Sequence, residues 1–219
     1  MGEIINIYIN VVDRITNPPK GLLSDTGVLA SVNMNTRQFL VTVLPSEEGI
    51  RPLAEKTAYI KERTSVVPDY YLRTDFEALE NIIDAVKGID VTTEKNYKIG
   101  ESLYPRGVNH MTGRHAMALF KKTCKTEEEM LSLRESVVEG LIRKGFEGFS
   151  FSYNLPKLYS VLKNDIETNI NAAVIKDLYS RRTSLKDRWH IEKQYMMKND
   201  TEEELNSKYS RVKTFNNIF

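Results

Sequence analysis

The sequence predicts an α+β fold with an N-terminal antiparallel β block, packed helices and a mainly helical C-terminal arm. Three observations support this prediction. Apolar and polar residues alternate near the start of the chain, as in half-buried strands. From about residue 51 the apolar residues recur with the period of a helix. The C-terminal part keeps that period but carries more polar residues than one packed core needs.

Three apolar runs predict the strands of the β block. Ile5, Ile7 and Ile9 alternate with polar neighbours, and the runs 27–32 and 38–44 are rich in β-branched residues. The short segment between the last two runs holds two asparagines. Because Asn tolerates a positive φ, this segment suits a hairpin turn.

Three capping boxes predict where helices begin. A Thr followed three residues later by Glu occurs at 74–77, 126–129 and 201–204, and this pair can satisfy the unpaired N–H groups of a first helical turn. Gly88 and Gly145 follow the first two apolar stripes and are the expected helix ends.

The remaining segments carry weaker patterns. Residues 89–113 contain several glycines and one proline, and we predict an irregular loop there. Alternating aromatic and serine residues predict a strand at 149–153, and helical periodicity predicts helices at 154–180 and 183–198.

These elements predict two regions. Residues 1–153 form a mixed α+β body, and residues 154–219 form a helical C-terminal region that we interpret as an extended assembly arm. A chain of 219 residues can hold one large domain or two small ones.

Composition excludes several classes of protein. One cysteine excludes a disulfide scaffold and a four-thiolate zinc site. The balance of 31 Lys+Arg against 30 Asp+Glu lacks the overall positive charge of a nucleic-acid coat protein. The acidic start of the chain predicts no signal peptide. No apolar run reaches the roughly 18 residues of a membrane helix, so we predict a cytoplasmic or virion location and no membrane contact.

Positive charge gathers between residues 101 and 125, where Glu101 is the only acidic residue. Lys and Arg side chains that contact phosphates supply most sequence-independent affinity for nucleic acids. A nucleic-acid-binding protein that uses this basic loop is therefore one hypothesis, and an ordinary solvated surface is the alternative. The residues of this predicted site are Arg106, Arg114, Lys121, Lys122 and Lys125.

A second hypothesis is a phosphodiesterase-type hydrolase that uses His110 and His115. The triplet His110-Met111-Thr112 resembles one half of the active site of two-histidine phosphoesterases. That chemistry needs a second such triplet, and neither His115 nor His190 is followed two residues later by Thr or Ser. The histidines lack carboxylates at ligand spacing and no Walker A motif occurs, so we predict no metal and no cofactor.

The leading hypothesis is a non-enzymatic structural or assembly protein that acts through protein–protein contacts. Aromatic side chains gather near the C-terminus among polar residues, as at many protein interfaces. A homo-oligomer or larger assembly would use them, and a viral or phage particle component of connector or tail type is one setting. No complete catalytic motif occurs, which favours a non-enzymatic role. The predicted interface residues are Trp189, Tyr195, Phe215 and Phe219.

Overall fold

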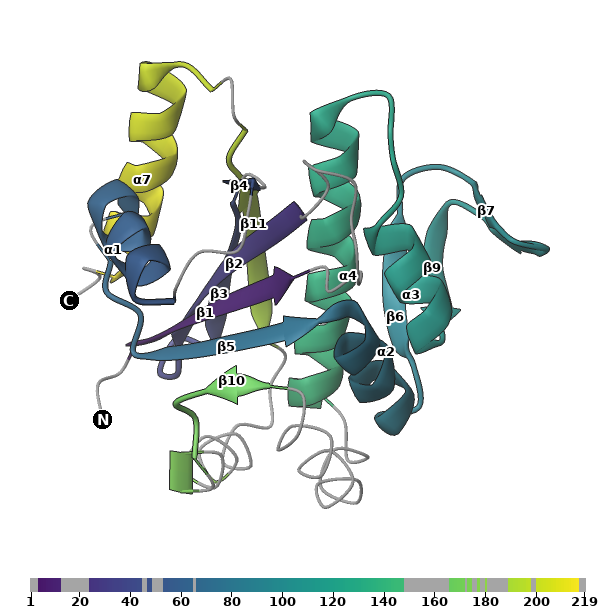
Figure 1. The fold of residues 1–219 in the computed structure, drawn as a ribbon, viewed down its shortest axis with the longest axis horizontal. Helices are drawn as coiled ribbons and strands as arrows, with labels where there is room; N and C mark the ends of the chain where they lie inside the picture. Colours follow the sequence, from purple (N-terminus) through teal and green to yellow (C-terminus); the bar gives the residue numbers. More distant parts are fainter. Residues whose placement is uncertain are drawn as a thin grey trace. The chain divides into compact units, whose positions relative to one another are not determined.

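The protein folds into two compact units, which Figure 1 shows in a computed structural model. Unit 1 comprises residues 1–74 and 167–219, and unit 2 comprises residues 75–166. The structure describes residues 4–12, 24–44, 47–48, 53–64, 66–147, 166–171, 173–174, 177, 180, 189–197 and 200–216. The predicted α+β class with an antiparallel N-terminal block is confirmed. The predicted boundary at residue 153 lies outside the described residues and stays a prediction.

Unit 1 is built on one mixed sheet with the strand order β10-β5-β1-β2-β3-β11, and β4 pairs with β2. Its strands are β1 (Ile4–Val12), β2 (Ser24–Asn33), β3 (Gln38–Val43), β4 (Glu47–Glu48), β5 (Tyr70–Asp75), β10 (Glu167–Thr168) and β11 (His190–Tyr195). The pairs β1–β2 and β2–β3 are antiparallel. The predicted hairpin turn is confirmed, because Oδ1 of Asn33 accepts hydrogen bonds from the backbone N–H groups of Asn35 and Thr36 at 3.0 Å.

The C-terminal region contributes strands to this sheet, so two helix predictions fail locally. Residues 190–195, predicted as helix, form β11 in parallel with β3. Residues 167–168, also predicted as helix, form β10 beside β5. The tertiary pairing overrides the local period in both segments. The predicted strand at 149–153 lies outside the described residues.

Two helices lie beside each other on one face of the sheet, α1 (Leu53–Thr64) and α7 (Glu202–Asn216) (Figure 1). They bury an apolar cluster that combines side chains of the sheet with side chains of both helices. Its buried members are Tyr8, Leu29, Leu40, Leu44, Ile60, Val66, Met196, Val212 and Phe215. This face of β1 is covered, so the polar residues that alternate with its isoleucines do not all face solvent.

In its described residues, 75–147 and 166, unit 2 combines helices with short strands. Its elements are α2 (Phe76–Ala85), β6 (Ile89–Thr93), β7 (Tyr97–Ile99), β8 (Ser102–Tyr104), β9 (Gly107–Met111), α3 (Gly113–Phe120) and α4 (Glu127–Glu147). Strands β6 and β9 pair in antiparallel, and β7 and β8 form a hairpin. The irregular loop predicted over 89–113 is therefore wrong. Two glycines at positive φ made the segment resemble a loop, Gly100 in the turn between β7 and β8 and Gly107 at the start of β9.

The capping boxes of unit 2 are realised only in part. The Thr126 hydroxyl accepts the Glu129 N–H at 3.2 Å, as predicted. The prediction for Thr74 is displaced by one residue, because the carboxylate of Asp75 caps α2 by accepting the Ala78 N–H at 2.8 Å. Asp and Thr are both good N-caps, and the sequence holds them side by side.

The capping box of α7 is complete. The Glu204 N–H donates to the Thr201 hydroxyl at 3.2 Å, and the Thr201 N–H donates to the Glu204 carboxylate at 2.8 Å. The backbone hydrogen bond from Thr201, followed by the one from its hydroxyl, lowers the pKa of Glu204.

Replacing Thr201 with Ala is expected to lower the free energy of unfolding by about 1 kcal/mol, because α7 loses its cap. Chemical denaturation followed by circular dichroism measures this change. Thr214→Ala, an exposed change in the same helix, is the control and should have little effect. Because the pKa of Glu204 is lowered by folding, its contribution is present above the ordinary pKa of Glu and is lost as the pH falls through the lowered value. A Thr201→Ala variant as stable as the parent chain at neutral pH contradicts the assignment.

Within the described ranges, no helix is long and apolar enough to cross a membrane.

Candidate functional site

The topology of unit 1 brings the carboxyl ends of several strands to one end of the sheet. Strand β1 is antiparallel to β2, which is antiparallel to β3, and β11 runs parallel to β3. Figure 1 shows β5 pointing the same way as β1. In sheets with parallel strands, ligands commonly bind beyond these carboxyl ends. Side chains near the ends of β1 and β5 are therefore the first candidates for a site.

Arg73 on β5 is the charged group held most firmly there. Its Nε donates to the Asn10 side chain at 2.8 Å, and its Nη1 donates to the Glu167 carboxylate at 3.2 Å. The Arg73 side chain is only 11% exposed, whereas the Glu167 side chain is 53% exposed. The guanidinium therefore has a fixed position at the margin of the core, while its carboxylate partner faces solvent.

The support for Arg73 extends into the core. Asn10 is fully buried, and its amide nitrogen donates to the Tyr8 hydroxyl at 3.4 Å. The ring of Tyr8 lies across Gly27, where a Cβ atom would come within 3.0 Å of the hydroxyl oxygen. A residue with a side chain at position 27 would push the ring away. We call Tyr8, Asn10, Arg73 and Glu167 the Arg73 cluster.

The sequence patterns missed this cluster. The alternation in β1 indicated a strand with Asn6 and Asn10 on its solvent face, and both are buried. The donor and acceptor of the Arg73–Asn10 bond are 63 residues apart. No local pattern signals a contact across that separation.

The predicted basic site lies entirely in unit 2. Its residues come from the turn between β8 and β9, from α3 and from the segment between α3 and α4. Lys121 places its ammonium 4.7 Å from the centre of the Phe76 ring. Lys122 is half-buried. The other four residues of the predicted site are exposed: Arg106, Arg114, Lys121 and Lys125. Their role in binding nucleic acid stays a prediction.

The predicted interface residues have different environments. Trp189 is 5% exposed and its ring lies 5.0 Å from that of Phe39. Phe215 belongs to the buried cluster under α7, and Tyr195 is half-buried. Phe219 lies outside the described residues. Packing within unit 1 accounts for Trp189 and Phe215, and their role in assembly stays a prediction.

The two histidines of the hydrolase hypothesis have separate partners. His110 on β9 bonds Asp90 at 2.7 Å through Nδ1 and the Lys87 carbonyl at 3.0 Å through Nε2. His115 on α3 bonds the Tyr104 hydroxyl through Nδ1. The structure therefore engages both ring nitrogens of His110 with the protein itself. No group of three or more His, Cys, Asp or Glu side chains in the described part of the chain could hold a metal ion.

Another cluster of polar side chains, this one in unit 2, surrounds Cys124. Glu129 forms an ion pair with Lys95 at 2.5 Å and accepts a hydrogen bond from Tyr97 at 3.3 Å. Burial and the charge of Glu129 raise the pKa of Tyr97 to about 12. The same two causes, burial first, raise the pKa of the Cys124 thiol. A raised pKa keeps the thiol protonated, which disfavours a role as nucleophile.

Cys124 is expected to react with iodoacetamide more slowly in the folded protein than in the urea-unfolded chain at pH 8, because the thiolate is the reactive form. Mass spectrometry of timed samples measures the rate. Glu129→Gln removes the negative charge and should speed alkylation, whereas Glu128→Gln on the same helical turn should not. Equal rates in the folded and unfolded chains contradict the raised pKa.

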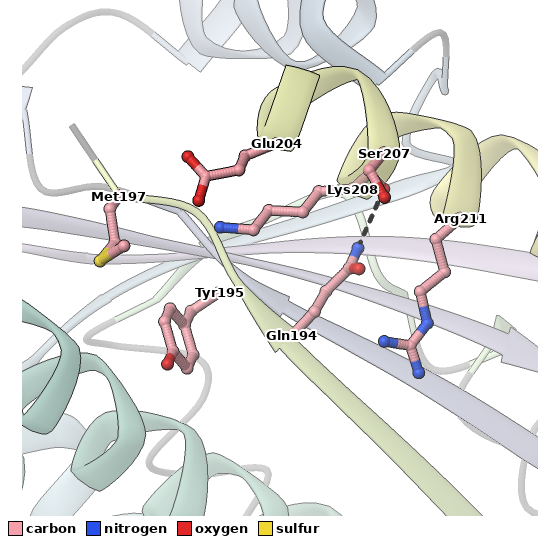
Figure 2. A pocket seen from close by; sticks show the side chains of 7 residues that line it. All are labelled: Gln194, Tyr195, Met197, Glu204, Ser207, Lys208 and Arg211. Carbon is pink, nitrogen blue, oxygen red and sulfur yellow. Dashed lines mark hydrogen bonds between the residues drawn. The ribbon is translucent and has the colours of Figure 1, made fainter. Parts of the chain in front are cut away.

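A pocket of about 400 Å³ lies between β11 and α7 in unit 1 (Figure 2). Gln194, Tyr195 and Met197 line it from the strand and the turn that follows. Glu204, Ser207, Lys208 and Arg211 line it from the helix. Its volume lies in the range of roughly 300–1,000 Å³ typical of small-molecule sites.

Comparison with known proteins identifies relatives. The LytR_cpsA_psr family model matches residues 53–217. The chain is 24% identical over 124 residues to the polyisoprenyl-teichoic acid–peptidoglycan teichoic acid transferase TagU of Bacillus cereus, a match that covers 55% of this chain and 41% of TagU. It thus spans less than half the length of the curated relatives it matches.

Solved structures share the fold at low sequence identity. TagV of B. subtilis superposes with a TM-score of 0.74 at 14% identity, over 98% of each chain. TagT bound to LI-WTA superposes with a TM-score of 0.70 at 13% identity, over 97% of this chain and 90% of TagT. These similarities establish the fold of the chain.

The matches correct the leading hypothesis from the sequence. A structural or assembly component of a virion is wrong, because the family match and the curated relatives point to transferases of the cell wall. The nucleic-acid-binding and hydrolase alternatives for the function are set aside on the same finding. The family match spans well over half of the 219 residues, and the chain therefore belongs to the LytR_cpsA_psr family.

Proposed function

We propose that this chain transfers an acidic polymer from a polyisoprenyl carrier to peptidoglycan, and that it acts at the cell envelope. The proposal takes its substrates from the relatives. TagU is named as a transferase of teichoic acid from a polyisoprenyl-linked donor to peptidoglycan, and TagT is described in a complex with LI-WTA. Family membership supports the extension of this chemistry to the present chain.

The observation that carries the proposal is the fixed position of Arg73 near the carboxyl ends of β1 and β5. A transfer reaction breaks the bond between polymer and carrier as the bond to the acceptor forms. Acidic groups close to that bond need a positive partner that does not have to rearrange. A guanidinium presents N–H donors in a planar fork that matches such groups.

Glu167 gives the site a way to exchange ligands. Its carboxylate occupies the Arg73 fork at 3.2 Å, and the Glu167 side chain is mostly exposed. Because water can solvate this carboxylate when it leaves Arg73, it can give way to an acidic group of the donor. The bond from Arg73 to Asn10 would hold the guanidinium in place during this exchange.

A transfer assay tests the function directly. The purified chain is incubated with labelled polyisoprenyl-linked teichoic acid and insoluble peptidoglycan, and the label in the washed peptidoglycan is counted over time. We expect label to accumulate only when donor, acceptor and folded protein are all present. The proposed function is contradicted if the washed peptidoglycan from the complete reaction carries no more label than the peptidoglycan from a heat-unfolded control.

A further inference from the structure

Gln194 has a buried polar atom that the protein leaves without a partner. The residue is 8% exposed, and its Oε1 has no hydrogen bond among the described residues. The amide nitrogen donates to the Thr42 hydroxyl at 3.0 Å and to the Lys208 carbonyl at 3.3 Å. Because a carbonyl only accepts, the nitrogen must face Lys208, and this fixes the orientation of the amide. An unsatisfied buried acceptor is costly, so a donor from a ligand is favoured at Oε1.

The charges around Gln194 are balanced. Figure 2 shows its side chain between Lys208 and Arg211. Both oxygens of the Asp200 carboxylate accept from Lys208, at 2.7 and 2.8 Å, and the Glu192 carboxylate accepts from Arg211 at 2.6 Å. Each cation of the pocket thus has a carboxylate of its own, which disfavours a strongly anionic ligand.

The other lining groups suit a ligand with hydroxyl groups and apolar C–H faces. The ring of Tyr195 and the thioether of Met197 are half-buried and provide apolar surface. Ser207 and Arg211 are exposed and carry hydrogen-bonding groups on the helix side. A few convergent polar groups beside an aromatic ring are the usual composition of a specific small-molecule site.

We propose that the pocket between β11 and α7 binds a neutral saccharide unit of the peptidoglycan acceptor, with a sugar hydroxyl donating to Oε1 of Gln194. The choice of peptidoglycan rests on the proposed function. Charge decides between the two polymers of that reaction, because the paired cations of the pocket favour an uncharged sugar over the acidic polymer.

The placement of the pocket suits a polymer that reaches along the sheet. Strands β5 and β11 are separated by β1, β2 and β3. Four steps of about 4.8 Å between neighbouring strands place the Arg73 strand roughly 19 Å from the pocket strand. A single sugar cannot span that distance, whereas a glycan strand can occupy the pocket and extend toward Arg73.

Isothermal titration with soluble N-acetylglucosamine oligosaccharides, a neutral glycan that lacks the free lactyl carboxylates of peptide-free peptidoglycan, tests the proposal on the intact chain. We expect binding by the parent protein, and a Kd about tenfold higher for Gln194→Met, which keeps the side-chain length and removes the acceptor. Tyr195→Leu should also weaken binding and covers the case in which Gln194→Met does not fold. Arg143→Gln, a half-buried cation paired with Glu139 on α4, outside the pocket, is the control and should bind like the parent.

The outcomes separate this inference from the proposed function. No binding of glycan by the parent chain overturns the inference, as does equal binding by the parent and both pocket variants. Teichoic acid that binds in place of the glycan, with the same dependence on Gln194, overturns the choice of polymer. Glycan binding that depends on Gln194 supports the inference even when the transfer assay is negative, and in that case only the proposed function fails.

Discussion

Gly113→Ala is expected to destabilise unit 2 by about 3–5 kcal/mol, at the upper end of the range for single substitutions. A Cβ atom at position 113 would lie 2.1 Å from the Glu80 carbonyl oxygen and 2.8 Å from its carbonyl carbon. Both atoms belong to the backbone of α2, so no side-chain rotation relieves the clash. The Gly113 N–H also donates to the Asp84 carboxylate at 2.8 Å, which fastens the start of α3 to α2.

Separation of the two helices would also disturb the packing beneath them. The rings of Phe76 and Phe120 lie edge to face with centres 5.8 Å apart, and both residues are buried.

Denaturant titration followed by circular dichroism measures the loss of stability in Gly113→Ala. Gly145→Ala is the matched control, because no atom lies within 4 Å of a Cβ built there. In helix α4 this change should stabilise the protein by up to about 1 kcal/mol. A Gly113→Ala variant that unfolds at the same denaturant concentration as the parent contradicts the close approach of α2 and α3.

Local patterns in the sequence predicted the elements whose stability is decided locally. The strands at 27–32 and 38–44, the hairpin between them and the helix starts at 127 and 202 all follow from residues within a few positions of one another. In these segments, side-chain alternation, turn residues and caps agree with the tertiary structure.

The strands that the sequence patterns did not predict are very short, lie among turn residues or pair with a distant part of the chain. Strands β7 and β8 have three residues each, too few for a visible alternation. Strand β6 does alternate, with Ile89, Val91 and Thr93 buried, but the glycines and the proline nearby outweighed this signal. Strand β11 contains Glu192 and Lys193, which are poor strand residues, and it is stabilised by parallel pairing with β3 about 150 residues earlier.

The candidate sites depend even more on distant contacts. The hydrogen bond from Gln194 to Thr42 joins residues 152 positions apart. In the sequence Gln194 stands among polar residues that resemble a solvated helix. Only the sheet reveals that its amide is buried, and only the strand order shows that Asn10 supports Arg73. Functional residues whose partners are far away in the sequence cannot be recognised from the spacing of residues in a motif.

Arg73→Gln is expected to lower kcat/KM for polymer transfer by about 100-fold, which corresponds to roughly 2.7 kcal/mol of transition-state stabilisation. The substitution removes the positive charge and keeps a hydrogen-bonding side chain next to Asn10. Arg73→Lys should recover only part of the activity, because one ammonium cannot reproduce the planar fork that bonds Asn10 and Glu167 together.

Substitutions of the two residues that contact Arg73 test the same prediction. Asn10→Leu is expected to lower transfer less than Arg73→Gln, because the charge remains while its orientation is lost. Glu167→Gln removes the competing carboxylate and should lower KM for the donor with little change in kcat. Arg143→Gln, in a half-buried pair with Glu139 on α4, should leave kcat/KM unchanged and so shows that loss of a positive charge alone has no effect. Rates are measured at several donor concentrations, so that kcat and KM separate. An Arg73→Gln variant that folds and transfers within about twofold of the parent rate would remove Arg73 from the site, because a charge that contacts the transferred group cannot be lost at so small a cost.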